Sequence, residues 1–353
     1  MPSFVPGLEL SKRFYVEAVR PVLEKAFPGV PYSAALLGAG SEVFGYDTGM
    51  STDHDWGPRV LLFLPEDDLP LTMQVAALLS DSLPATYGGY RVLRPVAAPE
   101  EHLLSRTYVG PLSTFVWQSL AYDVRQPLEM ADWLSIPSQA LREMIAGMVF
   151  HDGLGTLAPL RERLAYYPRD VWLYMLAADW QRIGQEEHLM PRAGHVGDEL
   201  GSAIIGSRLV RDAMHLAFLV ERRYPPYPKW FGRAFRELAG AEALLPLLWQ
   251  VQQASTWSER QEALVAVWEY LARMHNALGI TERLTPEADA FYDRPFQVIG
   301  GERYARALCA EIVDPAVRSL LGRPLIGSVD QWSDNTDLKA CTLRRSVRGL
   351  YEG

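Results

Sequence analysis

The sequence has few cysteines, no long apolar run and no excess of basic residues. Only Cys309 and Cys341 occur among 353 residues, too few for a disulfide framework or a zinc site. No stretch approaches the ~18 uncharged apolar residues that a membrane span requires. The first residues also lack the pattern of a signal peptide. These absences predict a cytoplasmic protein with reduced thiols and no membrane association.

The charge balance disfavours nucleic acid as a general partner. The chain has 34 basic and 43 acidic residues, a net charge of −9, whereas proteins that bind phosphate backbones are usually basic. Hydrophobic residues make up 48% and charged residues 22%, as in ordinary globular proteins. At about 150 residues per domain, the length predicts roughly two domains.

The pattern of elements changes near residue 130. Before it, short apolar runs alternate with amphipathic segments, which predicts an α+β domain with a small mixed sheet flanked by helices. After it, most segments have the 3.6-residue period of helices, which predicts an all-α domain. We therefore expect domains at 1–130 and 131–325, and an irregular C-terminal segment at 326–353. The predicted strands are 32–37, 59–64, 90–94 and 102–109, and the predicted helices are 11–27, 69–83, 138–150, 157–165, 170–189, 197–223, 230–252, 257–277 and 302–321.

The stretch from Leu36 to Leu64 carries the chemistry. A Gly40-Ser41 turn follows the first predicted strand, and eleven residues separate it from Asp53 and Asp55, which precede the second. Residues i and i+2 of an extended chain point to one side, so both carboxylates would face one point. Hard cations such as Mg²⁺ prefer such oxygens. Glycine-rich turns can cradle phosphates with backbone N–H groups. The alternative is that both aspartates cap local N–H groups before a strand.

This order resembles the signature of the DNA polymerase β-like nucleotidyltransferase superfamily, over roughly residues 11–125. An α+β domain followed by helices is also similar to its small-molecule branch, such as the aminoglycoside nucleotidyltransferases. Longer phrases resemble a bacterial family of unknown function within that superfamily, found chiefly in actinomycetes. These phrases are GSEVFGYDTGMSTDHDWGPRV, YYPRDVWLYMLAADWQRIGQEEH, GHVGDELGS and RRYPPYPKWFGRAF. The resemblance implies a catalytic domain at 1–130 and a helical substrate-binding domain at 131–325.

One departure concerns the superfamily's third carboxylate, which lies on a later strand. The corresponding predicted strand, 102–109, has no Asp or Glu, and Tyr108 falls where the acid is expected. Glu100, Glu101, Asp67 and Asp68 lie nearby in sequence without a convincing position. The base would then come from the helical domain, or the enzyme would be impaired.

The helical domain offers further candidate residues. Glu187 and Asp198 are possible bases, and Arg192 is a possible substrate contact; the alternative is a solvated helix end with Asp198 as its cap. The resemblance favours Lys229, in a proline-rich loop, as a cation that neutralises the triphosphate. Without the resemblance, the sequence predicts an ordinary surface lysine at this position. The tryptophans at 172, 180, 249 and 268 have helical spacings and are predicted to be core residues.

Three functions remain open at this stage. In the first, Gly40 and Ser41 hold the phosphates of an NTP, expected to be ATP, and Asp53 and Asp55 hold two Mg²⁺ ions. The enzyme would transfer a nucleoside monophosphate to a hydroxyl of a small-molecule acceptor. In the second, the protein binds nucleotide without turnover and regulates a partner. The third, modification of a tRNA end, is disfavoured by the charge and by the lack of an aromatic-basic strip.

Overall fold

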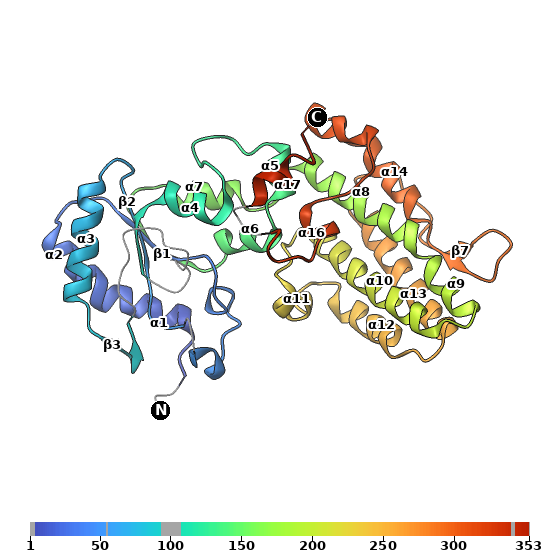
Figure 1. The fold of residues 1–353 in the computed structure, drawn as a ribbon, viewed down its shortest axis with the longest axis horizontal. Helices are drawn as coiled ribbons and strands as arrows, with labels where there is room; N and C mark the ends of the chain where they lie inside the picture. The colour runs from blue at the N-terminus through green and yellow to red at the C-terminus, as the bar shows by residue number, and fades with distance from the viewer. Residues whose placement is uncertain (1–3, 54–55, 93–106, 340–342, 353) are drawn as a thin grey trace. The chain divides into compact units, whose positions relative to one another are not determined.

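The computed structural model describes residues 4–53, 56–92, 107–339 and 343–352. The chain divides into two compact units, Met1–Leu128 with Ala140–Ala165, and Glu129–Gln139 with Tyr166–Gly353. The first unit is α+β and the second is built mainly from helices (Figure 1). The predicted class, a small mixed sheet flanked by helices and followed by a helical region, is confirmed.

A four-stranded mixed sheet organises the first unit, in the order β5-β2-β1-β6. Strand β1 (Ser33–Leu36) is antiparallel to β2 (Leu61–Leu64), with Ala34 opposite Leu62. Strand β2 is parallel to β5 (Tyr108–Pro111). All residues of β1 and β2 are buried, as expected for strands covered on both faces. The part of the fourth predicted strand before residue 107 lies outside the described residues.

Strand β6 (Met148–Asp152) was not predicted. The sequence prediction continued a helix over 138–150, but α6 (Ser138–Ile145) ends earlier and β6 pairs antiparallel with β1. Between them, Gly147 has φ +70°, and a Cβ there would lie 1.9 Å from the Leu36 carbonyl oxygen. Only glycine fits that conformation and contact, so the chain leaves the helix and returns to the sheet.

Helices cover the sheet of the first unit. Apolar side chains of the first helical segment and of α3, such as Phe14, Val19 and Val75, pack in one buried cluster with Leu62 and Val109 of the sheet. The predicted helix 11–27 is α1 (Gly7–Phe14), a π-helical turn η1 (Tyr15–Val19) and α2 (Arg20–Ala26). The other elements of this unit are α3 (Leu69–Ser82), β3 (Thr86–Tyr87), β4 (Tyr90–Arg91), α4 (Leu112–Leu120) and α7 (Leu157–Arg163).

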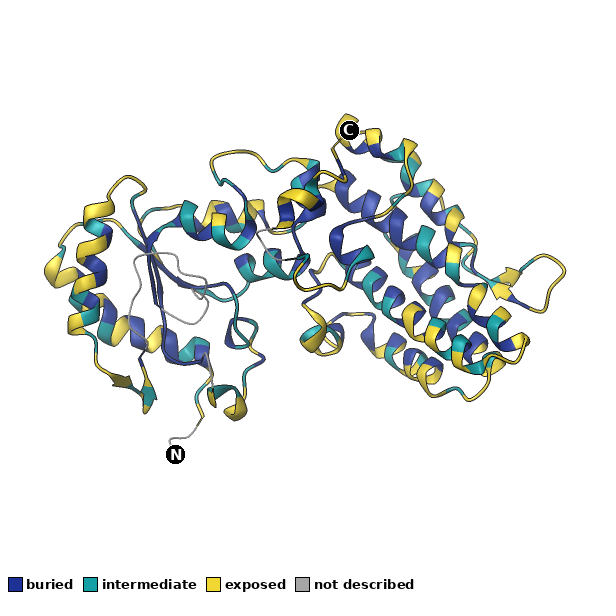
Figure 2. Ribbon diagram, in the orientation of Figure 1, coloured by how far each residue is buried: buried dark blue, intermediate teal, exposed yellow. Residues whose placement is uncertain are grey.

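The second unit buries large aromatic side chains between its helices, whose inward faces are dark blue in Figure 2. Trp180 of α8 (Arg169–Glu186) stacks on Tyr304 of α14 (Gly301–Ala310), with ring centroids 4.3 Å apart. Trp172, Trp180 and Trp268 are buried as predicted, whereas Trp249 is 57% exposed, so that prediction was wrong. Helical spacing alone does not say whether a position near a helix end is covered.

Two predicted helices of the second unit are divided. Segment 230–252 is split between α11 and α12, and 302–321 between α14, α15 and η5. The C-terminal segment contains short helices, α16 and α17. The elements are α5 (Met130–Ser135), α8 (Arg169–Glu186), α9 (Leu189–His195), α10 (Glu199–Val220), α11 (Pro228–Phe235), α12 (Ala241–Gln253), α13 (Trp257–Ala277), β7 (Asp289–Ala290), β8 (Gln297–Val298), α14 (Gly301–Ala310), α15 (Pro315–Arg318), η5 (Ser319–Gly322), α16 (Val329–Trp332) and α17 (Arg344–Arg348).

No helix in the described ranges combines the length and the apolar character needed to cross a membrane.

Candidate functional site

Three residues separate the end of β1 from the Gly40-Ser41 turn, which lies in the segment where the sequence predicts a turn. Gly38 and Gly40 have φ of +84° and +136°, conformations that side chains rarely adopt. The Gly38 N–H donates to the Glu143 carbonyl of α6 at 2.9 Å. Ser41 precedes a 3-10 turn, η2 (Glu42–Phe44), and its carbonyl accepts the Tyr46 N–H at 2.8 Å. The backbone of this turn is therefore held in one conformation by bonds to two parts of the unit.

A buried ion pair underlies the turn. The Arg59 guanidinium donates through Nη2 to Glu42 Oε1 at 2.6 Å, and the two side chains are 3% and 1% exposed. The same nitrogen donates to the Ala39 carbonyl at 2.5 Å. A Cβ on Gly40 would lie 2.5 Å from Arg59 Nη2. The turn thus rests on a charged pair that leaves no room for a side chain at Gly40.

The loop after the turn is tied down at Asp47 and ends at Asp53. Asp47 Oδ2 accepts the Gly7 N–H at 2.7 Å and the Trp56 indole N–H at 3.1 Å. Asp53 is exposed and is the last residue of a 3-10 turn, η3 (Gly49–Asp53). The extended backbone assumed for residues 53–55 is therefore wrong at Asp53, because that residue is part of a turn. Asp55 lies outside the described residues, so its convergence with Asp53 stays a prediction.

The position expected for a third carboxylate holds a buried tyrosine. Tyr108 on β5 is 1% exposed, and its hydroxyl donates to the Pro111 carbonyl at 2.9 Å. Burial raises the pKa of this phenol well above its ordinary value, which makes it unsuited to act as a base near neutral pH. Glu100 and Glu101 lie outside the described residues. Among the residues that are described, no three Asp, Glu, His or Cys side chains form a metal-binding group.

Glu187 of the second unit caps a helix. Its carboxylate accepts the N–H groups of Ile299, Gly300 and Gly301 at 2.5, 3.0 and 3.3 Å, at the start of α14. Burial raises the pKa of Glu187 to about 7, although these three bonds act in the opposite direction. Both carboxylate oxygens are engaged by backbone, which favours a structural role for Glu187 over that of a base.

The other predicted residues of the second unit lie at exposed positions. Asp198 is the N-cap of α10 and accepts the Gly201 N–H at 2.7 Å. Arg192 is exposed in the last turn of α9. Lys229 is exposed in the first turn of α11, with Nζ 4.9 Å from the centroid of the Trp230 ring. These residues and Glu187 belong to the second unit, whereas Gly40, Ser41 and Asp53 belong to the first.

A buried polar group in the second unit was not predicted. Asp179 of α8 is 2% exposed, and its Oδ1 accepts the Gln331 amide at 2.7 Å. Its Oδ2 has no hydrogen-bond partner in the described part of the chain. Burial raises the pKa of Asp179 to about 7. Nearby, Arg182 Nε donates to Asp212 Oδ2 at 2.8 Å. The sequence signal for this group was Asp179 itself, a charged residue that stands among apolar residues of one predicted helix.

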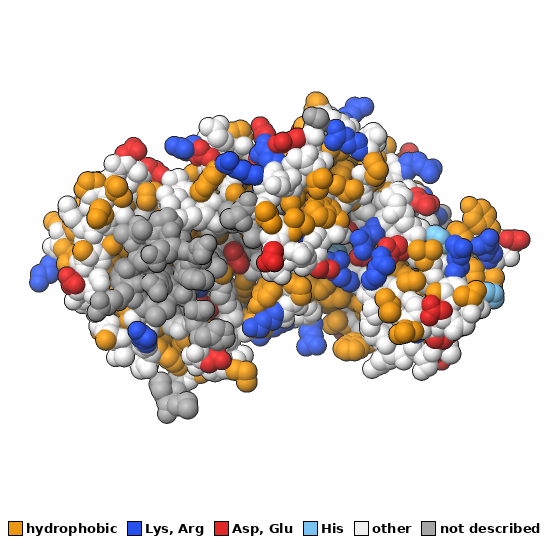
Figure 3. Space-filling model, in the orientation of Figure 1, with side chains coloured by type: hydrophobic (Ala, Val, Ile, Leu, Met, Phe, Trp, Pro, Cys, Tyr) orange, Lys and Arg blue, Asp and Glu red, His pale blue; other side chains and the backbone are white. Residues whose placement is uncertain are grey.

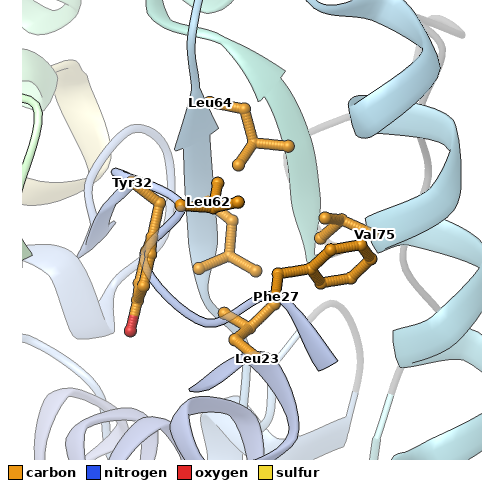
Figure 4. A pocket seen from close by; sticks show the side chains of 7 residues that line it. Leu23, Phe27, Tyr32, Leu62, Leu64 and Val75 are labelled. Atoms are coloured by element: carbon orange, nitrogen blue, oxygen red, sulfur yellow. The ribbon is translucent and has the colours of Figure 1, made fainter. Parts of the chain in front are cut away.

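An apolar hollow in the first unit lacks the chemistry of a catalytic site (Figure 4). It lies between α2, the sheet and α3, and none of its lining residues is charged. A triphosphate would require cations or oriented N–H groups. The lining residues are Leu23, Phe27, Val30, Tyr32, Leu62, Leu64 and Val75.

Acidic and basic side chains are interspersed on the face of the molecule drawn in Figure 3. Neither sign forms a continuous strip among the described residues drawn there.

Sequence reasoning missed Glu42 and Arg59, which contact the Gly-Ser turn, and Asp47 and Trp56, which bond to each other in the following loop. A signal was present, since Glu42 follows the turn directly and Arg59 stands immediately before an apolar run. Charged residues in such segments are rarely fully buried unless they are paired. The sequence does not show that these two pair with each other.

Comparisons with known proteins give two matches. A family described as a domain of unknown function (DUF4037) matches residues 133–231. A crystal structure of a nucleotidyltransferase-like protein from Exiguobacterium sibiricum 255-15 matches 93% of this chain and 88% of its own, at 14% identity and a TM-score of 0.35. No curated protein matches the chain.

Proposed function

We propose that this protein is a Mg²⁺-dependent nucleotidyltransferase that transfers a nucleoside monophosphate from an NTP, expected to be ATP, to a hydroxyl of a small molecule. Pyrophosphate is the second product. One observation carries the proposal. A glycine-rich turn with two positive-φ residues follows a buried strand, and a buried ion pair contacts this turn. A preorganised turn of this kind presents N–H groups to phosphate. The chain then reaches the exposed Asp53 before the antiparallel neighbouring strand.

Each residue has a defined task in this proposal. Gly40 and Ser41 orient the β- and γ-phosphates through backbone N–H groups and the serine hydroxyl. Asp53 and Asp55 would hold two Mg²⁺ ions, and carboxylate oxygens suit that ion. Bound there, Mg²⁺ supplies charge neutralisation for the triphosphate. Lys229 is proposed to add a positive charge from the second unit.

The acceptor side of the reaction is less constrained. Both carboxylate oxygens of Glu187 accept backbone N–H groups. Glu187 is therefore not proposed as the base that removes the proton of the acceptor hydroxyl. Asp198 is engaged at one oxygen as a helix cap and stays a candidate base, with Arg192 as a candidate acceptor contact. We place the enzyme in the cytoplasm, in keeping with two cysteines in the whole chain, since reducing compartments keep thiols free.

A regulatory nucleotide-binding protein is the second candidate. It is favoured by one observation: the residue in the position of the third carboxylate is a buried tyrosine bonded to the backbone. Such a protein would bind Mg²⁺-nucleotide through the same turn and aspartates without turnover.

Calorimetric titration with ATP, CTP, GTP and UTP, with and without Mg²⁺, tests the shared premise. Wild type and Asp53→Asn/Asp55→Asn are compared at equal protein stability, checked by thermal melting. Magnesium-dependent binding that the variant loses supports a nucleotide site, whereas no binding to any nucleotide contradicts both candidates.

Release of pyrophosphate over a panel of hydroxylated acceptors then separates the two candidates. Turnover that requires both aspartates establishes the transferase. Binding without turnover across the panel favours the regulatory protein.

A further inference from the structure

We infer that the buried Arg59–Glu42 ion pair positions the Gly40-Ser41 turn and couples it to the segment that enters β2. The inference rests on the proposed function, because it gives a role to two side chains that touch no substrate themselves. The inference concerns the geometry of the Gly40-Ser41 turn and not a step of the reaction.

The contacts place the pair on both sides of the turn. Arg59 Nη2 donates to the carbonyl of Ala39, before the turn residues, at 2.5 Å, and to the carboxylate of Glu42, after them, at 2.6 Å. A Cβ on Gly40 would lie 2.7 Å from each Glu42 oxygen. One guanidinium nitrogen therefore bridges the turn, and the backbone of Gly40 lies directly against the pair.

Arg59 also occupies the right place in the chain. It stands four residues after Asp55 and two residues before β2. Its own N–H donates to Ser11 Oγ of α1 at 3.3 Å. A shift of Arg59 would therefore move the Gly40-Ser41 turn and the first residues of β2 together.

Stability alone does not explain why a charged pair is buried here. Two charges removed from water gain little over an apolar pair of similar volume. A guanidinium is planar and directional, however, and can fix the geometry of several acceptors at once. Placing a backbone turn accurately is a role that an apolar pair could not perform.

The test replaces the pair by apolar side chains in Arg59→Met/Glu42→Leu. We expect a melting temperature within a few degrees of wild type, but roughly 10- to 100-fold weaker Mg²⁺-ATP binding, since small misplacements of binding groups cost that much. Backbone amides of residues 38–46 should also exchange hydrogen faster. The matched control is Arg20→Met/Glu24→Leu, which removes an exposed pair on α2, 2.7 Å apart and 52% and 56% exposed. It should change none of the three.

The outcomes separate this inference from the proposed function. Unchanged hydrogen exchange and unchanged affinity in Arg59→Met/Glu42→Leu overturn the inference. Faster exchange in a protein whose wild type binds no nucleotide overturns the proposed function and keeps the pair as the support of the turn.

If the double variant does not fold, Arg59→Lys supplies the second test. Lysine keeps the positive charge but lacks the planar guanidinium, so Mg²⁺-ATP binding should again be weaker than in wild type. Full affinity in the lysine variant overturns the inference.

Discussion

Two buried carboxyl groups, Glu42 of the first unit and Asp179 of the second, have different partners. In the first unit, Glu42 faces the guanidinium of Arg59 at 2.6 Å. In the second, Asp179 accepts the Gln331 amide and has no ion pair among the described residues, and burial raises the pKa of Asp179 to about 7. A carboxylate with a cationic partner can hold a backbone turn in place, whereas a buried carboxyl without one binds a proton instead. These two groups are similarly buried, so the difference between them lies in the hydrogen-bond partners that each contacts.

The largest effect should come from breaking the pair in the first unit on one side only. Arg59→Met leaves the Glu42 carboxylate buried without its cation, which we expect to cost about 3–5 kcal/mol of unfolding free energy. Urea titration measures it. Arg20→Met, at the exposed pair on α2, should stay near zero. A loss below 1 kcal/mol for Arg59→Met would mean that water reaches Glu42.

The second-largest effect is a pH dependence of the unfolding free energy, caused by Asp179 of the second unit. The folded pKa of Asp179, about 7, lies above its ordinary value of 3.8, so between these values the folded protein holds a proton that the unfolded chain releases. Stability should therefore fall as pH rises from about 4 to about 7. Asp179→Asn removes this contribution, of the order of 2–4 kcal/mol.

Urea titrations of wild type and Asp179→Asn at several pH values measure the difference. The control is Asp198→Asn, an exposed cap at which Asn serves equally well. Parallel pH profiles for wild type and Asp179→Asn would show that Asp179 titrates normally.

Lys229 tests the contrast between buried and exposed charge. Lys229→Ala removes an exposed side chain, so the melting temperature should stay near that of wild type. Nucleotide affinity should weaken by about 1.5–3 kcal/mol, the value of a charge-assisted hydrogen bond. Calorimetry checks this, with the exposed Lys25→Ala in the first unit as the matched control. Unchanged affinity removes Lys229 from the proposed site.

The smallest effect concerns Glu187, a buried carboxyl group that accepts three backbone N–H groups at the start of α14. Glu187→Gln turns one oxygen into an NH₂ group that cannot accept these bonds, at a cost of about 1–2 kcal/mol. Because we assign Glu187 to capping α14, pyrophosphate release should keep its wild-type rate when assayed below the melting range. A variant with normal stability and no turnover would instead identify Glu187 as a base.

Local pattern was sufficient for much of the fold. Strands β1 and β2 follow from short apolar runs, and α13 from an apolar periodicity and a capping box of Thr256 and Glu259. The position of the Gly40-Ser41 turn after β1 was also predicted. In these segments, local propensity and tertiary burial require the same conformation.

The missed features depend on partners distant in sequence. Strand β6 forms because β1, more than a hundred residues earlier, offers an edge for pairing, and no local periodicity reports that edge. The Arg59–Glu42 pair joins residues on either side of a loop. Glu187 looked like a catalytic candidate because the N–H groups that it caps belong to α14, far along the chain.

The sequence by itself determined the two classes of architecture, the glycine turn and the types of side chain that flank it. Only the tertiary structure decided which charges are buried and what each of them faces. The physical reason is that composition and periodicity act over one or two turns of chain, whereas desolvation and pairing depend on neighbours brought together by folding. The same type of side chain thus contacts the Gly40-Ser41 turn at Glu42, caps a helix at Glu187 and has a raised pKa at Asp179.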